Sequence, residues 1–277
     1  MQSDLWLVVN SASGSNSESA VREVVAALAA SGAAPARVVD GQAGLPDRAE
    51  LEKAGIGRLA VFAGDGTVSS LAIGIEGWGG GLLVLPGGTA NLLARELHGD
   101  DDAPAIAARL PQMTRARRPC IRSAGLTALV EVLVGPGATW SDVREELREG
   151  GVGQVAGAAV AAIRESTSGP MVAMVDPALG RPDGYAGVRL EVRAAGMAVE
   201  GYGAETIGDY LRTGIALLRR DFRKGPHDEL GQHRAVSCRS LGAAPLPLMV
   251  DGERREGAPV QQFSLADFAL DLFVSQP

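Results

Sequence analysis

Short apolar runs alternate with longer segments that carry one apolar face over the first 113 residues. Apolar runs of four or five residues bounded by turns are typical of buried strands, and a 3.6-residue period predicts amphipathic helices. We predict strands at residues 5–9, 36–39, 59–62 and 82–85, and helices at residues 18–30, 46–54, 67–75, 90–97 and 104–110. This βαβα order predicts a parallel, doubly wound sheet.

The pattern becomes β-rich near Arg115. We predict strands at residues 126–134, 171–175, 188–192, 197–199, 235–238, 246–250 and 268–274, a hairpin turn at 180–187, and helices at 141–149, 152–163 and 207–220. The fold class is therefore α/β. A doubly wound domain over residues 1–113 is followed by a β-rich domain with helical insertions over residues 114–277, and the final residues are free to return to the first domain.

Composition narrows the class of protein. Hydrophobic residues make up 46% of the chain and charged residues 21%, as in soluble globular proteins. The net charge of −7 argues against nucleic acid as a partner. No apolar stretch reaches the length of a membrane span, the N-terminus lacks a signal-peptide pattern, and two cysteines, Cys120 and Cys238, make no disulfide framework. We expect a cytoplasmic protein without a transmembrane segment.

Two glycine-rich stretches follow predicted strands: Gly64-Asp65-Gly66-Thr67 and Pro86-Gly87-Gly88-Thr89-Ala90-Asn91. Glycines at a strand-to-helix turn let backbone N–H groups approach a ligand, and a helix N-terminus favours an anion. Two such turns suggest one phosphate-binding crevice at neighbouring strand ends. A bare carboxylate would repel phosphate there, so Asp65 indicates a divalent cation or a proton to be abstracted.

A polar loop follows the first predicted strand: Asn10-Ser11-Ala12-Ser13-Gly14. Its side chains and bare N–H groups can hydrogen-bond phosphate oxygens. A loop that only caps the next helix has the same composition, so both interpretations stay open.

The three loops together resemble the catalytic domain of the diacylglycerol kinase-like lipid kinases, a superfamily that includes sphingosine and ceramide kinases and, more distantly, NAD kinases. The order Asn-x-x-Ser-Gly, Gly-Asp-Gly-Thr and Leu-Pro-x-Gly-Thr-x-Asn matches that family. NAD kinases lack the third loop, so the lipid-kinase branch is favoured.

The resemblance implies an α/β nucleotide-binding domain, a β-sandwich-like domain and an active site in the cleft. It also implies ATP and Mg²⁺ as cofactors, with Asp65 as the metal ligand and a catalytic residue. The implied nucleotide-binding residues are Asn10, Ser11, Ala12, Ser13, Gly14, Asp40, Gly64, Asp65, Gly66, Thr67, Gly88, Thr89 and Asn91.

An apolar run near the C-terminus ends in Asp251-Gly252-Glu253 and resembles the family's Asp-Gly-Glu strand end. The resemblance implies that Glu253 is the catalytic base that accepts the proton of the lipid hydroxyl. The alternative is an Asp-Gly hairpin turn with an exposed glutamate.

The chain also departs from the family. Ala63 replaces a glycine, Ser70-Leu71 stand near an expected Asn-Glu, Ser11 replaces a proline, and Leu92 follows Asn91 where an acidic residue is common. These changes bear on the metal geometry and the substrate more than on the fold.

Clustered arginines at residues 115–118 and basic residues at 219–224 fit either contact with anionic lipid head groups or solvated surface charge. We expect an ATP-dependent kinase of diacylglycerol or a related lipid at the membrane surface, peripheral to the inner face, and leave a homodimer open. The alternatives are a kinase of another lipid or long-chain-base alcohol, and a degenerate, non-catalytic nucleotide- or lipid-binding protein.

Overall fold

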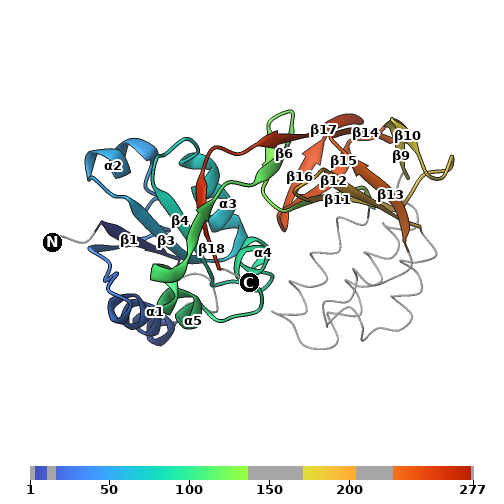
Figure 1. Ribbon diagram of the computed structural model, residues 1–277. Coiled ribbons are helices and arrows are strands. Elements are labelled where there is room, and N and C mark those ends of the chain that lie inside the picture. Colours follow the sequence, from blue (N-terminus) through green and yellow to red (C-terminus); the bar gives the residue numbers. More distant parts are fainter. Residues whose placement is uncertain (1–3, 11–16, 137–170, 204–226, 276–277) are drawn as a thin grey trace, which may run out of the picture. The chain divides into compact units, whose positions relative to one another are not determined.

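The computed structural model describes residues 4–10, 17–136, 171–203 and 227–275 (Figure 1). The chain divides into two compact units, which we describe separately. Unit 1 contains Met1–Pro119 and Asp267–Pro277, and unit 2 contains Cys120–Ala266. The chain thus leaves unit 1 and returns to it at the C-terminus. The assignment of nucleotide binding to the first domain and acceptor binding to the second stays a prediction.

Unit 1 is built on a six-stranded sheet with the order β2-β1-β3-β4-β18-β5. The strands are β1 (Leu5–Val9), β2 (Arg37–Asp40), β3 (Arg58–Ala63), β4 (Gly81–Pro86), β5 (Thr114–Ala116) and β18 (Asp271–Val274). The first five in spatial order run parallel, and β5 pairs antiparallel with β18. The predicted α/β class with a parallel sheet is confirmed.

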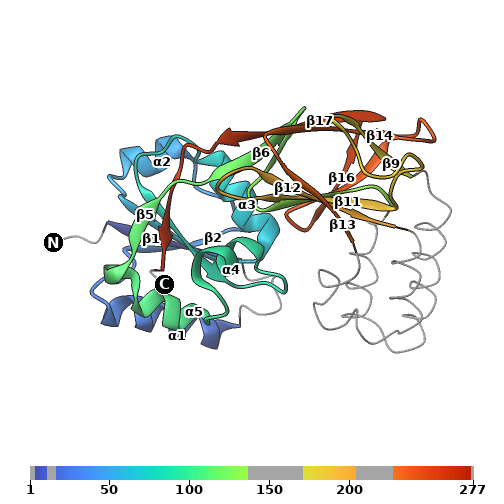
Figure 2. The same ribbon diagram turned by 45° about the vertical axis from the view of Figure 1, so that its right-hand side comes forward.

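Helices cover both faces of this sheet. They are α1 (Glu18–Ala30), α2 (Arg48–Lys53), α3 (Asp65–Gly74), α4 (Leu92–His98) and α5 (Ala103–Ala108). Leu5 and Leu7 share one core cluster with Leu28 of α1, while Trp6 and Val8, on the opposite face, are buried as well. Figures 1 and 2 show α1 and α5 side by side beneath the sheet, with α2 and α3 on the other side. Burial on two faces explains the continuous apolar runs of these strands.

Side-chain caps set where three helices begin. The Ser17 hydroxyl accepts a hydrogen bond from the Ala20 amide at the start of α1. Asp47 and Asp102 do the same for α2 and α5 at 2.8 Å. These short polar side chains satisfy amides that have no partner inside the helix.

The described residues of unit 2 form two six-stranded sheets, with orders β10-β9-β14-β17-β6-β7 and β13-β12-β11-β8-β15-β16. The first sheet contains β6 (Pro119–Ser123), β7 (Leu126–Ala128), β9 (Val172–Asp176), β10 (Ala178–Leu179), β14 (Ala235–Ser240) and β17 (Val260–Asp267). The second contains β8 (Glu131–Val134), β11 (Gly187–Val192), β12 (Met197–Tyr202), β13 (Asp228–His233), β15 (Leu246–Val250) and β16 (Glu253–Gly257).

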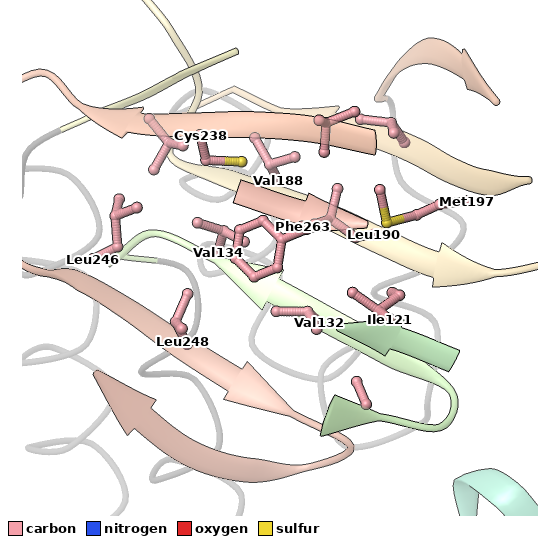
Figure 3. Close-up of a cluster of buried hydrophobic side chains, with 14 of the residues drawn as sticks. Ile121, Val132, Val134, Val188, Leu190, Met197, Cys238, Leu246, Leu248 and Phe263 are labelled. Carbon is pink, nitrogen blue, oxygen red and sulfur yellow. The ribbon is translucent and has the colours of Figure 1, made fainter. Parts of the chain in front are cut away.

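Alternate residues of both sheets meet in one core (Figure 3). Val188 and Leu190 of β11 point into it from one sheet, and Cys238 of β14 and Phe263 of β17 point into it from the other. The period of two along these strands is that of sheets packed face to face, so unit 2 has the layers of a β-sandwich.

Several predicted elements differ from the structure. The strand predicted at residues 126–134 is two strands, β7 and β8. The amide of Gly184 donates to the carbonyl of Arg181, which makes the predicted turn, but this turn joins β10 to β11 in different sheets and is not a hairpin. The helices predicted at residues 141–149, 152–163 and 207–220 lie outside the described residues.

None of the helices within the described ranges has both the length and the apolar character needed to cross a bilayer.

Candidate active site

The candidate site lies at one edge of the unit 1 sheet. Strands β1, β3 and β4 are neighbours and parallel, so their carboxyl ends meet at the same edge. Asn10 follows β1, Gly64 follows β3, and Gly87 follows β4. Asn10 and the two glycine loops therefore lie at neighbouring strand ends, where a ligand-binding crevice of a parallel sheet is expected.

Asn10 connects the first loop to the second. Its Nδ2 donates a hydrogen bond to Oγ1 of Thr67 at 2.9 Å. Its Oδ1 accepts a longer one, 3.4 Å, from Nε2 of Gln42, which lies just beyond β2. The side chain of Asn10 is thus held between the ends of β2 and β3 rather than pointing freely into solvent.

Asp65 connects the second loop to the third. It is the first residue of α3, and its carboxylate accepts hydrogen bonds from the amides of Asn91, at 2.9 Å, and Leu92, at 2.5 Å. These amides belong to the first turn of α4, where a negative charge is favourable. Asp65 therefore caps α4 from the neighbouring strand end.

Asn91 shapes the third loop. It adopts a left-handed conformation with φ 51°, which asparagine tolerates better than most residues. Its Oδ1 accepts from the amide of Gly88 at 2.7 Å, and its Nδ2 donates to the carbonyl of Gly88 at 2.9 Å. The loop from Gly88 to Asn91 is closed by this one side chain, with Thr89 in the turn.

The two glycine loops touch through their backbones. A Cβ atom on Gly88 would lie 2.6 Å from Cα of Gly64, which is closer than real Cβ atoms approach backbone. Gly88 is therefore required by space. The result is a short stretch of bare backbone between the ends of β3 and β4, of the kind that can lie against phosphate.

Comparison with known proteins agrees with this geometry. Residues 4–119 match the family model described as the diacylglycerol kinase catalytic domain. The predicted resemblance to the diacylglycerol kinase-like lipid kinases is confirmed. The matched segment contains the sequences of all three loops. It ends at Pro119, which is also the last residue of the first segment of unit 1. No curated protein matches the chain.

Solved structures resemble the whole chain. A candidate diacylglycerol kinase from Bacillus anthracis str. Sterne has a TM-score of 0.62 and 16% identity, covering 99% of this chain and 97% of that one. A diacylglycerol kinase from the same strain gives 0.60 and 16%, with the same two coverages. A further candidate diacylglycerol kinase from that strain gives 0.63 and 14%, over 100% and 99%. At these identities, the likeness shows the fold alone.

Not all of the residues implied by the diacylglycerol kinase resemblance can be placed. Ser11, Ala12, Ser13 and Gly14 lie outside the described residues. Asp40 ends β2, and its Oδ1 accepts from the amide of Gln42 at 3.0 Å, while Gly66 lies in the first turn of α3. Sequence reasoning did not identify Gln42. The one signal in the sequence was its position: Gln42 follows the strand predicted at residues 36–39, in the same way that Asn10 follows the strand predicted at residues 5–9.

Glu253 belongs to unit 2 and begins β16. The turn before it has positive φ at both central residues, 47° at Asp251 and 89° at Gly252, as a type I′ hairpin requires. Val250 pairs with Glu253 across the turn, and the glutamate is exposed. The hairpin alternative of the sequence analysis is thus present in the structure, and the catalytic role of Glu253 stays a prediction.

Asp251 was not identified as a functional residue from sequence. It is 2% exposed, and its carboxylate accepts from the amides of Leu129, Val130 and Glu131 at 2.7, 2.8 and 3.0 Å. Burial raises the pKa of the Asp251 carboxyl, and the three amide donors act in the opposite direction. A buried carboxylate at a turn is therefore fastened to the connection between β7 and β8.

The arginine cluster at residues 115–118 is used within unit 1. Arg115 donates to the carbonyl of Gly57 at 3.1 Å and lies over the ring of Phe273. Arg117 pairs with Asp271 at 2.8 Å, and Arg118 with Glu96 at 3.5 Å. The contacts of Arg115 and Arg117 tie β5 and the residue after it to β18 and to the start of β3, and the Arg118–Glu96 pair joins the segment after β5 to α4. Residues 219–224 lie outside the described residues.

His98, the last residue of α4, is buried, and its Nδ1 lies 2.9 Å from Oγ of Ser275. Burial, with the nearby charge of Arg109, lowers the pKa of His98 from 6.5 to about 4. The imidazole is therefore neutral at pH 7.

Metal ligation was also predicted, at Asp65. Among the side chains that the structure describes, no group of three or more His, Cys, Asp and Glu residues is arranged to hold a metal ion. Magnesium commonly takes one or two carboxylates and completes its shell with substrate phosphates, so the Asp65 carboxylate at the glycine loops fits that donor set.

Proposed function

We propose that this protein is an ATP-dependent lipid kinase that transfers the γ-phosphoryl group of ATP to a hydroxyl of diacylglycerol or a related lipid. One observation carries the proposal: Asn10 and the two glycine loops lie at adjacent strand ends and are linked by Asn10–Thr67 and Asp65–Asn91 hydrogen bonds. The match to the diacylglycerol kinase catalytic domain supports the reaction class.

ATP is proposed to bind with its phosphates along the bare backbone near Gly64 and Gly88. The space beside Gly88 is so narrow that a single Cβ atom would fill it. Such a site favours a ligand that is bound by backbone N–H groups. Asn10 and Thr67 supply polar side chains beside it, and Asn91 keeps the third loop in shape. Asp65 is the proposed Mg²⁺ ligand, and Mg²⁺ would offset the negative charge of the phosphates.

Glu253 is the proposed general base. Phosphoryl transfer to an alcohol needs a carboxylate that accepts the hydroxyl proton while the phosphates are held elsewhere. Glu253 is an exposed carboxylate at a defined turn, which suits a group that must meet a substrate. We also propose that the β-rich domain binds the acceptor, and that the acceptor is a lipid at the membrane surface.

A specific observation favours the second candidate, a non-catalytic nucleotide-binding protein. Both carboxylate oxygens of Asp65 accept backbone amides of α4, so this residue has a structural task that needs no chemistry. Such a protein would keep the crevice and bind ATP without turning it over.

One experiment separates the candidates. The melting temperature is measured with and without millimolar Mg-ATP, because a ligand that binds only the native state stabilises it. The protein is then incubated with γ-labelled ATP and diacylglycerol in mixed micelles, and labelled phosphatidic acid is measured. A rise in melting temperature with Mg-ATP together with labelled phosphatidic acid supports the kinase. A rise in melting temperature without any labelled product, from diacylglycerol or from a lipid extract tested in the same way, supports the non-catalytic candidate. An unchanged melting temperature contradicts both.

A further inference from the structure

We propose that Asp251 is a positioning residue, whose buried carboxylate holds the β15–β16 hairpin in place and thereby fixes Glu253. The inference rests on the proposed function, in which Glu253 accepts the proton of the lipid hydroxyl. It adds a residue that does not touch the substrate and acts through its neighbour.

The backbone conformation at the turn is one that aspartate tolerates. A φ of 47° costs most residues with a side chain, but Asp-Gly is one of the usual pairs in a type I′ turn. The turn alone therefore accounts for an aspartate at this position. What distinguishes Asp251 from an ordinary turn residue is the set of contacts that its carboxylate makes.

Those contacts reach a segment more than 100 residues away. Oδ2 accepts from the amide of Leu129 at 2.7 Å, and Oδ1 accepts from those of Val130 and Glu131 at 2.8 and 3.0 Å. The amide of Asp251 donates in turn to the carbonyl of Glu131 at 3.0 Å. Four hydrogen bonds thus join one turn residue to the start of β8.

Residues 129–131, which donate hydrogen bonds to Asp251, lead into a strand in the interior of the sheet. β8 lies between β11 and β15 in the sheet, and Val132 and Val134 are buried in the sandwich core. Glu131 pairs with Arg189 of β11 at 2.7 Å, with both side chains nearly buried. The carboxylate of Asp251 is therefore bound to a rigid part of unit 2.

Glu253 has no comparable anchor in its own strand. Among the strands that the structure describes, β16 ends the sheet order and pairs only with β15, and its residues from Glu253 to Glu256 are exposed. A base that must lie within hydrogen-bond reach of a proton loses rate when it is displaced by as little as 1 Å, by roughly 10²-fold. Asp251, two residues earlier, supplies the constraint that an edge strand lacks.

A carboxylate suits this task better than an amide. Three N–H donors converge on its two oxygens, and an ionised carboxylate can accept all of them. Asparagine has one acceptor oxygen and would turn an NH₂ group toward an N–H donor. Asp251→Asn therefore keeps the volume and removes the anchor, while Asp251→Gly keeps the positive φ and removes the whole side chain.

The test compares Asp251→Asn, Asp251→Gly, Glu253→Gln and the Asp251→Asn/Glu253→Gln double variant in the diacylglycerol phosphorylation assay. We expect both Asp251 variants to lower kcat by about 10- to 100-fold with an unchanged KM for ATP. The double variant should be no slower than Glu253→Gln alone, because Asp251 acts only through Glu253. Asp183→Asn, an exposed aspartate in the turn after β10, is the matched control and should change nothing.

Amide hydrogen exchange provides a readout that does not depend on turnover. In both Asp251 variants, exchange should quicken at residues 129–131 and in the β15–β16 hairpin while the core strands keep their protection. Unchanged kcat, effects of Asp251→Asn and Glu253→Gln that multiply in the double variant, or unchanged exchange would overturn the inference. Absence of turnover in the unmutated protein contradicts the proposed function instead, and the exchange measurement then still decides whether Asp251 anchors the hairpin.

Discussion

The shape of the candidate site depends on a few individual residues that connect its loops to one another. Asp65 and Asn91 each make two hydrogen bonds to backbone, and Gly88 leaves no space for a side chain. The sequence marked all three residues as ligand-binding candidates. The structure adds that they also bind one another, so their substitution affects the shape of the site as well as any ligand.

Truncation of Asp65 tests these two roles. Asp65→Ala removes the cap of α4, which should lower the free energy of unfolding by about 0.5 to 2 kcal/mol. Asp47→Ala is the matched control, since Asp47 caps α2 in the same unit and has no proposed chemical role. We expect similar losses of stability in chemical denaturation, and a loss of phosphoryl transfer of at least about 10²-fold for Asp65→Ala only. Equal activity in the two variants would reduce Asp65 to a cap.

Gly88→Ala tests the backbone contact between the glycine loops. The added Cβ would meet Cα of Gly64 at 2.6 Å, and backbone cannot move aside cheaply, so we expect a loss of about 1 to 3 kcal/mol and a smaller thermal shift with Mg-ATP. Gly74→Ala is the control, because a Cβ atom there meets nothing within 4 Å. It should be neutral or stabilise α3 by up to about 1 kcal/mol. A normal Mg-ATP shift in Gly88→Ala would argue against phosphate binding at this point.

His98 should make the stability depend on pH. Its folded-state pKa of about 4 lies below the ordinary 6.5, so the unfolded state binds more protons between these values. The stabilisation is complete above pH 6.5 and is lost as the pH falls toward 4, about 2 kcal/mol of it by pH 5. Denaturation of His98→Gln at pH 7 and pH 5 should show a smaller decrease than the unmutated protein. Parallel decreases would assign the pH dependence to other groups.

At the scale of elements, the sequence predicted the strands that are continuous apolar runs and missed several that are not, including β6 and β17, although both carry buried residues. β1, β3 and β4 are buried on both faces and read as continuous apolar runs, so they were predicted to within one residue at either end. β13 and β16 are edge strands with the sequences DELGQH and ERREG, which carry no hydrophobic signal. They are strands because they form backbone hydrogen bonds with neighbouring strands. Pairing between segments that are far apart in the sequence cannot be deduced from local composition.

The same limit applies to the candidate site. Local motifs identified Gly64, Asp65, Gly88 and Asn91, because glycines and caps at strand ends are visible in the sequence. Gln42 and Asp251 act through partners 32 and more than 100 residues away, and neither position differs locally from an ordinary loop or turn residue. Such residues become apparent only when the fold brings their partners together.

Strand β18 shows how strongly a distant segment can support unit 1. Leu272 is 1% exposed and pairs with Leu82 of β4, so Leu272→Ala should cost about 2 to 5 kcal/mol. Val260→Ala is the control at a 56% exposed position, where we expect a change within about 0.5 kcal/mol. Chemical denaturation measures both. A cost below 1 kcal/mol for Leu272→Ala would mean that the sheet tolerates the loss of its C-terminal strand.

At the scale of the whole molecule, unit 2 is inserted into unit 1. Cys120–Ala266 lies between the two segments that build the first sheet, and β18 takes its place between β4 and β5. The net charge of −7 is spread over a chain whose described arginines at 115, 117 and 118 pair within unit 1.

The late arrival of β18 has a consequence for synthesis on the ribosome. Domains usually fold as units, with N-terminal ones first, as the chain emerges at about 5–20 residues per second. Here the order is reversed, because unit 2 is complete once residue 266 has emerged, whereas the sheet of unit 1 still lacks its fifth strand. Until Asp271–Val274 have left the exit tunnel, β4 presents an unpaired edge to the cell. A nascent chain stalled before Asp271 would therefore be a target for chaperones and proteases, even though most of unit 1 was made first.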